Sequence, residues 1–196
     1  MIFPPDFTYP AEKTAAASVA ACVIAARSPR RGAVVQAGGC AGLWPLALAD
    51  HFQQVFTFEP DPENFRCLRA NVRSTPTISA YDYAVRDVRG YVGLTRPKPK
   101  AGLWQVEGDG DIKAIALDDV LLDIAVDAIV LDVEGSEPAA LRGATRLIVM
   151  HRPLLWFEYL HHTDAIDTFL GAHGYVPAHP AFGSDYYSVH ASCVVH

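Results

Sequence analysis

From Ala33 onward, short runs of apolar residues alternate with segments that carry apolar residues on one helical face. Apolar runs this short, rich in β-branched residues, predict buried strands. Strands that alternate with helices form a parallel sheet that is covered on both faces. The expected strands are 32–37, 55–58, 77–84, 112–117, 128–131 and 154–157, followed by an antiparallel pair near 175–176 and 186–193. The expected helices are 45–52, 61–71, 138–146 and 163–173, and residues 86–110 are predicted to be an irregular exposed loop.

Composition narrows the class of protein. The chain has 196 residues, of which 51% are hydrophobic, and this is enough for one domain and too apolar for a disordered chain. A net charge of −6 argues against a protein that binds duplex nucleic acid through its phosphates. The cysteines lie far apart without a C-x-x-C pair, so a disulfide framework and a zinc site are not expected. A reducing, cytoplasmic setting is the expectation.

The longest apolar run, Ala15 to Ala26, is too short to span a bilayer, which takes about twenty residues. We expect no membrane association and interpret the run as a helix. Residues 1–31 then form an N-terminal helical segment, a candidate lid, and residues 32–196 form the main domain.

A glycine-rich turn follows the first predicted strand, with glycines at Gly38, Gly39 and Gly42. Ligands of parallel sheets bind at the carboxyl ends of the strands, and glycine lets the backbone approach a ligand closely. The spacing does not fit the G-x-G-x-x-G turn of nicotinamide enzymes, whose third glycine falls three residues after the second. Glu59 ends the second predicted strand, about twenty residues beyond Gly38, where an acid accepts hydrogen bonds from ribose hydroxyls. Together these features indicate an adenosine-containing ligand.

Five blocks cover most of residues 33–158: VVQAGGCAGLWPLAL, FTFEPDPENFRCLRANV, AIALDDV, DAIVLDVEGSEPAALRGA and RPLLWFE. In this order they resemble the FkbM family of S-adenosylmethionine-dependent methyltransferases. The resemblance implies a single Rossmann-like α/β domain, whose mostly parallel seven-stranded sheet ends in a C-terminal antiparallel hairpin and carries helices on both faces. It also implies S-adenosylmethionine as cofactor and methylation of a hydroxyl group on a small molecule or sugar.

The resemblance also implies a set of cofactor-binding residues: Gln36, Gly38, Gly39, Gly42, Glu59, Pro60, Asp82, Tyr83 and Asp132. Gln36 stands where the family's D-x-G-A-N-x-G pattern has an acid that anchors the amino group of the cofactor. Its amide oxygen can accept the same hydrogen bond, without the assistance of a charge. Asp82 follows the third predicted strand, and two interpretations stay open: an acceptor for the adenine amine, or a solvated turn acid.

Three carboxylates follow neighbouring strands: Asp132 and Glu134 after residues 128–131, and Glu158 after 154–157. We predict that they are the catalytic residues and act as a general base or orient the substrate. Two other roles stay open: ligands of a divalent cation, or caps that stabilise the loops. We assign no residue as a metal ligand from the sequence. His161 and His162 follow Glu158 closely, and either is a secondary candidate for the proton acceptor.

Two other functions compete with methyl transfer. One is a nicotinamide-dependent oxidoreductase, which leaves the D-V-E-G block without a role. The other is a catalytically silent nucleotide-binding or scaffold domain, which is supported by Gln36 and Cys40, the two departures in the cofactor loop. The acceptor is expected to be a small molecule or sugar rather than nucleic acid, with its choice set by residues 1–30 and 86–110 and with Trp104 as a candidate contact. The sequence does not predict the oligomeric state.

Overall fold

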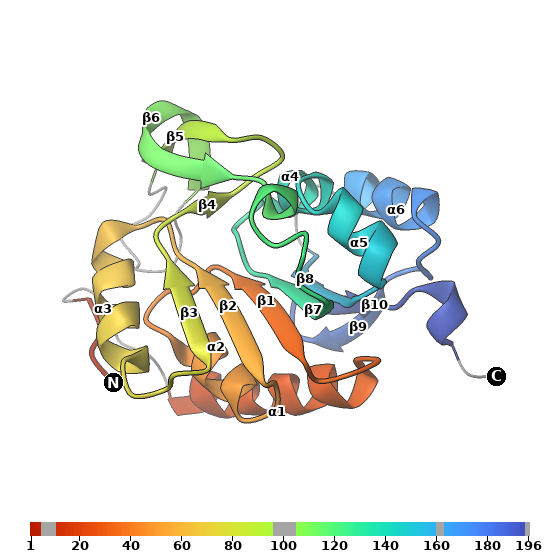
Figure 1. Cartoon of the computed structure of the whole chain (residues 1–196), viewed down its shortest axis with the longest axis horizontal. Coiled ribbons are helices and arrows are strands. Elements are labelled where there is room, and N and C mark those ends of the chain that lie inside the picture. Colours follow the sequence, from red (N-terminus) through yellow and green to blue (C-terminus); the bar gives the residue numbers. More distant parts are fainter. Residues whose placement is uncertain (5–10, 96–104, 160–162, 195–196) are drawn as a thin grey trace.

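The computed structural model describes residues 1–4, 11–95, 105–159 and 163–194, and its centre is a seven-stranded sheet (Figure 1). Its strand order is β3-β2-β1-β7-β8-β10-β9, with β10 antiparallel to both of its neighbours and the other pairs parallel. The strands are β1 (Ala33–Ala37), β2 (Gln54–Phe58), β3 (Ile78–Tyr81), β7 (Val126–Leu131), β8 (Leu154–Glu158), β9 (His179–Phe182) and β10 (Asp185–Ser188). This confirms the predicted fold: a mostly parallel seven-stranded sheet with a C-terminal antiparallel hairpin.

Helices cover both faces of the sheet. On one face lie α1 (Ala11–Arg27) and α2 (Leu43–Ala49), and on the other lie α4 (Glu137–Arg142), α5 (Thr145–His151) and α6 (Thr163–Ala172). Because side chains alternate along a strand, Val34 packs with the first group and Val35 with the second. Both faces of the central strands are therefore buried, as the near-continuous apolar runs predict.

The helix α3 (Pro62–Val72) begins where the sequence predicts. Asp61 is its N-cap, and the carboxylate of Asp61 accepts a hydrogen bond of 2.8 Å from the backbone N–H of Asn64. Pro62 occupies the first turn, where its missing N–H leaves no hydrogen bond unmade. The cap fixes the direction in which the chain leaves β2, and so it also fixes the turn that contains Glu59.

The expectation for residues 86–110 is wrong in part. They contain β5 (Gly90–Thr95) and the start of β6 (Gln105–Ile115), which pair antiparallel and form a second sheet, β4-β6-β5, with β4 (Ala84–Val85). The strand expected at 112–117 belongs to β6, which is the middle strand of this sheet and not an edge. The strand expected at 77–84 divides into β3 and β4. The proline-rich stretch 96–100 lies outside the described residues.

Two boundaries in the second half also differ from prediction. The helix expected at 138–146 is divided into α4, which ends at Arg142, and α5, which begins at Thr145. Between them Gly143 passes so close to another segment that a Cβ atom there would lie 1.8 Å from the carbonyl oxygen of Arg86. The C-terminal hairpin is β9–β10, whereas the predicted contact of 175–176 with 186–193 is reduced to an isolated bridge between Tyr175 and His190. Two short 3-10 turns, η1 (Leu117–Asp119) and η2 (Ala191–Cys193), complete the elements.

The N-terminal helix α1 packs on the sheet through the small side chains of Ala20 and Ala21 and the larger one of Ile24, all of them buried. Its division from the rest of the chain at residue 31 and its role as a lid stay predictions. Within the described part of the chain, no helix is both long and apolar enough to cross a membrane.

Candidate active site

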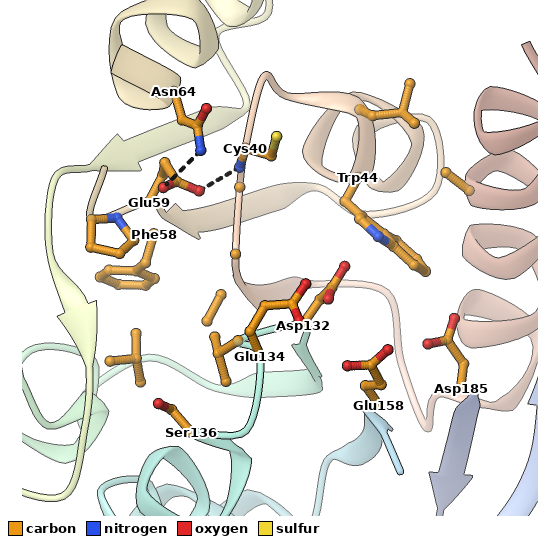
Figure 2. A pocket seen from close by; sticks show the side chains of 18 of the residues that line it. Cys40, Trp44, Phe58, Glu59, Asn64, Asp132, Glu134, Ser136, Glu158 and Asp185 are labelled. Carbon is orange, nitrogen blue, oxygen red and sulfur yellow. Dashed lines mark hydrogen bonds between the residues drawn. The ribbon is translucent and has the colours of Figure 1, made fainter. Parts of the chain in front are cut away.

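A cavity of about 610 Å³ opens at the carboxyl ends of β1, β2, β7 and β8 (Figure 2). It is the size of cavities that hold drug-sized ligands. Eight of the predicted cofactor-binding and catalytic residues line it: Gly38, Gly39, Glu59, Pro60, Tyr83, Asp132, Glu134 and Glu158. Gln36, Gly42 and Asp82 are not among its lining residues, and Trp104, His161 and His162 lie outside the described residues.

The glycine turn is clamped between the two neighbouring strands. The backbone N–H groups of Gly38 and Gly39 donate to the carbonyl oxygen of Phe58 at 2.9 and 3.0 Å, and the N–H of Asp132 donates to the carbonyl of Ala37 at 3.0 Å. Gly38 has φ +89°, and a Cβ atom there would lie 1.8 Å from the carbonyl oxygen of Asp132. Glycine is required here by the protein's own backbone.

The amide of Gln36 is used within the protein. Its side chain is buried, its Nε2 donates to the carbonyl of Ala37 at 3.1 Å, and its Oε1 accepts from the hydroxyl of Thr57 at 2.6 Å. The bond to Thr57 joins β1 to β2 beneath the turn. Gln36 therefore has a structural role in this arrangement, and a direct contact with a cofactor stays a prediction.

Glu59 is buried at the end of β2, with its carboxylate beside the glycine turn (Figure 2). One oxygen accepts from the backbone N–H of Cys40 at 2.7 Å, and the other accepts from the N–H of Asp61 at 2.9 Å and from the amide of Asn64 at 3.5 Å. Burial raises the pKa of Glu59 to about 7, although these hydrogen bonds oppose the shift. The oxygen bonded to Cys40 keeps a lone pair, because each carboxylate oxygen accepts two hydrogen bonds.

Cys40 has φ +45°, in the left-handed region that asparagine tolerates better than most residues. In the family pattern D-x-G-A-N-x-G this position is Asn. Burial, reinforced by the nearby Glu59, raises the pKa of the Cys40 thiol to about 12, so the group is a neutral thiol at physiological pH. Since the thiolate is the nucleophile, this cysteine is not an activated one.

Carboxyl groups from three strand ends gather on the opposite side of the cavity (Figure 2). Asp132 follows β7, Glu158 ends β8, and Asp185 begins β10 directly opposite Glu158 in the antiparallel register. Sequence reasoning missed Asp185, because its place depends on a strand pairing that no local motif signals. Glu134 lies beside Asp132 with φ +52°, a backbone conformation that is strained for a glutamate.

Burial and mutual repulsion disfavour charge in this group. The pKa of Asp132 is raised to about 6, by burial and by Glu158, while Lys13 and the indole N–H of Trp44 oppose the shift. Burial and the neighbouring carboxylates raise the pKa values of Glu134 and Asp185 to about 7. Glu137, buried at the start of α4, also has a pKa of about 7, mainly because it is desolvated, and it accepts from the N–H of Val133.

A stack of aromatic rings runs from the sheet to the cavity wall. The ring centroids of Phe58 and Tyr81 are 5.1 Å apart, and those of Tyr81 and Tyr83 are 6.4 Å apart, with nearly parallel planes. Phe58 and Tyr83 line the cavity on the side of Glu59. Asp82, between the two tyrosines, is exposed. In the described ranges, no three His, Cys, Asp or Glu side chains are placed to hold a metal ion.

The methyltransferase FkbM domain matches residues 38–177, which is more than two thirds of the chain and includes the glycine turn and the carboxylates at 132, 134 and 158. The chain belongs to the FkbM methyltransferase family. This confirms the resemblance seen in the sequence. Among curated proteins, no sequence matches the chain.

Solved structures support the same fold. An FkbM methyltransferase from Methylobacillus flagellatus is 23% identical with a TM-score of 0.59, and the match covers 80% of this chain and 43% of that protein. A precorrin-6y methyltransferase from Geobacter metallireducens is 13% identical with a TM-score of 0.52, covering 86% and 84% of the two chains.

A magnesium protoporphyrin IX methyltransferase from Synechocystis, solved with bound S-adenosylmethionine, is 10% identical with a TM-score of 0.51, covering 92% and 79% of the two chains. At these identities the likeness is one of fold. This chain spans less than half the length of the Methylobacillus protein.

The substitution Gly38→Ala tests the backbone clamp. Since its Cβ would overlap the carbonyl oxygen of Asp132, we expect the free energy of unfolding to fall by more than about 3 kcal/mol. Gly171→Ala in α6 is the matched control, because no atom lies within 4 Å of its Cβ and alanine favours a helix. Denaturant unfolding measures both variants. A Gly38→Ala protein as stable as the control would contradict the clamp.

The raised pKa values predict that stability falls as pH rises. Between the ordinary carboxyl pKa of about 4 and the folded value of about 7 at Glu59 and Glu137, the folded chain binds more protons than the unfolded chain. The free energy of unfolding therefore decreases across that window. We expect Tm to be at least about 4 °C lower at pH ~7.5 than at pH ~5.

Two variants identify the source of that dependence. Glu137→Gln keeps the hydrogen bond to Val133 and removes the titrating group, so the difference in Tm between the two pH values should shrink. Glu63→Gln, at an exposed position in α3, should leave the difference in Tm unchanged. Stability that is constant or increases from pH ~5 to ~7.5 would contradict the raised pKa values.

Proposed function

We propose that the protein is an S-adenosylmethionine-dependent methyltransferase that methylates a hydroxyl oxygen on a small molecule or sugar. The observation that carries the proposal is the single cavity in which a glycine turn, a buried strand-end acid and a cluster of carboxyl groups meet. Membership of the FkbM family supports methyl transfer, while the hydroxyl acceptor is our inference from the carboxylates.

The cavity fits S-adenosylmethionine. Its volume of about 610 Å³ is sufficient, and the backbone of Gly38 and Gly39 forms part of its wall. The remaining lone pair of Glu59 would accept a hydrogen bond from a ribose hydroxyl, and Pro60 continues the same wall. Phe58 and Tyr83 offer apolar faces on this side, which suits the adenine ring.

The carboxyl groups opposite would serve the acceptor. When bound, S-adenosylmethionine supplies a methyl group that its positive sulfur already activates, so positioning and modest base assistance are enough. Asp132 is our candidate base, because its pKa of about 6 lies near the pH at which a proton acceptor is effective. It would accept the proton of the acceptor hydroxyl, and Glu134 and Glu158 would orient that hydroxyl. Glu158 also helps to keep the pKa of Asp132 raised.

Titration with S-adenosylhomocysteine tests the cofactor. Calorimetry should show saturable binding to the wild-type protein and none of NAD⁺. Glu59→Gln removes the charge that receives the ribose hydroxyl, and we expect affinity to fall by about tenfold or more, as loss of a hydrogen bond to a charged group does. Glu63→Gln changes an exposed residue in the first turn of α3, and this variant should bind S-adenosylhomocysteine with wild-type affinity.

Three outcomes would overturn parts of this proposal. Unchanged affinity in a folded Glu59→Gln protein would remove this residue from the site. Binding of NAD⁺ in place of S-adenosylhomocysteine would indicate an oxidoreductase, and binding of neither would favour the silent scaffold.

Transfer itself is measured with a labelled methyl donor against hydroxyl compounds, amines, thiols and nucleic acids. We expect label on a small hydroxyl compound or sugar. Asp132→Asn keeps the shape of the side chain and removes its ability to take a proton, so turnover should fall by about a hundredfold while S-adenosylhomocysteine still binds. A fully active Asp132→Asn enzyme would exclude this carboxylate as the base, and label on nitrogen, sulfur or nucleic acid would contradict the hydroxyl assignment.

A further inference from the structure

The cavity continues beyond the part that the glycine turn and Glu59 surround. This second part, which we call the acceptor lobe, is lined by Trp44, Glu158, Phe182, Ser184 and Asp185. Figure 2 shows the carboxyl groups of Glu158 and Asp185 side by side, near the indole of Trp44. The turn between β9 and β10 and the N-terminal helix α1 border the lobe, and neither belongs to the glycine-turn side of the cavity.

The cavity is rich in carboxyl groups. Among its described lining residues are five, Glu59, Asp132, Glu134, Glu158 and Asp185, and one cation, Lys13. S-Adenosylmethionine carries one net positive charge, so the cofactor and Lys13 together can pair with two of the five, and a further cation would hold others in their charged form. An anionic acceptor such as a sugar phosphate would be repelled, since like charges in a partly desolvated site repel strongly. A cationic acceptor would be attracted.

Asp185 has a buried neighbour that supports its charge. The side chain of Trp156 is only 2% exposed, and its indole N–H faces the carboxyl of Asp185 closely enough to favour the charged form. Trp156 is not among the residues that line the cavity, so a ligand of the acceptor lobe contacts Asp185 and not this N–H.

The walls of the lobe are aromatic. The rings of Trp44 and Phe182 each lie 6.3 Å from the ring of Trp156, and Phe182 is 41% exposed. Aromatic faces bind the apolar side of a sugar ring or, through their quadrupole, a cation. A ligand of this lobe therefore meets carboxyl groups and aromatic faces together.

We propose that the acceptor is a hydroxyl compound with a protonated amine, of the amino-sugar class, whose ammonium group binds between Glu158 and Asp185. The ammonium supplies donors to both carboxylates, and the sugar ring lies against the aromatic side chains of Trp44 and Phe182. A second hydroxyl of the same ring then lies toward Asp132, which takes its proton. This inference rests on the proposed function and narrows its acceptor.

A charge series of one sugar tests the inference. Glucosamine, glucose and glucose 6-phosphate are titrated by NMR at neutral pH and equal ionic strength, with the protein saturated by S-adenosylhomocysteine. We expect glucosamine to bind at least about tenfold more tightly than glucose, as a charge-assisted hydrogen bond allows, and glucose 6-phosphate not to bind. Equal affinities, or a preference for the phosphate, would overturn the inference.

Three variants locate the effect. In Asp185→Asn the preference for glucosamine over glucose should fall to within about twofold, because the charged partner is lost. Phe182→Leu keeps an apolar side chain and removes the aromatic ring, so both sugars should bind more weakly. Asp119→Asn, exposed in η1, should behave as wild type. A preference that survives in folded Asp185→Asn would overturn the assignment.

The titration with S-adenosylhomocysteine separates this inference from the function on which it rests. If S-adenosylhomocysteine binds and the sugars show no dependence on charge, only the class of acceptor is wrong. If S-adenosylhomocysteine does not bind, the proposed function fails, and the amino-sugar acceptor fails with it.

Discussion

The contact between the carboxyl ends of β1 and β7 is the constraint on which the rest of the site depends. Gly38 passes so close to the carbonyl oxygen of Asp132 that no other residue fits, and the hydrogen bond from Asp132 N–H to Ala37 fixes the register. The same turn is held from the other side by the carbonyl of Phe58. Because of these contacts, the glycine turn, the residue after β2 and the acid after β7 surround one cavity.

A consequence of this arrangement is that buried carboxyl groups serve two purposes. Glu59 secures the turn by accepting from the backbone of Cys40 and Asp61 and keeps a lone pair for a ligand. Asp132 lies where its charge is disfavoured by burial and by Glu158. Groups like these destabilise the ligand-free protein near neutral pH, and a bound cation would recover that energy. The site is thus less stable than the sheet that supports it.

The sequence predicts the parts that local chemistry specifies. The strands β1, β2, β7 and β8 are near-continuous apolar runs, and the start of α3 has both an N-cap aspartate and a proline. The positions of Glu59 and Asp132 follow, since each comes directly after such a strand and parallel strands end at the same edge. These elements need no knowledge of distant contacts.

Features that depend on distant contacts escape prediction. The β5–β6 ladder is formed by two weakly patterned segments on either side of a proline-rich stretch. Position 143 requires glycine because Arg86 lies against it, and Asp185 joins the site because β10 pairs with β8. Gln36 holds the position of a cofactor ligand in the family pattern, yet its amide bonds to Thr57 and Ala37. In each case the partner is remote in sequence or unrelated to the motif.

Our central claim is that one cavity, built around the contact of Gly38 with Asp132, binds the cofactor. Hydrogen exchange measured by mass spectrometry with and without S-adenosylhomocysteine tests it most directly. We predict slower exchange confined to four segments that border the cavity: residues 37–42, 58–61, 83–85 and 132–134. Unchanged exchange in these segments, or protection at the amino ends of the strands around residues 53–54 and 76–77, would contradict the claim.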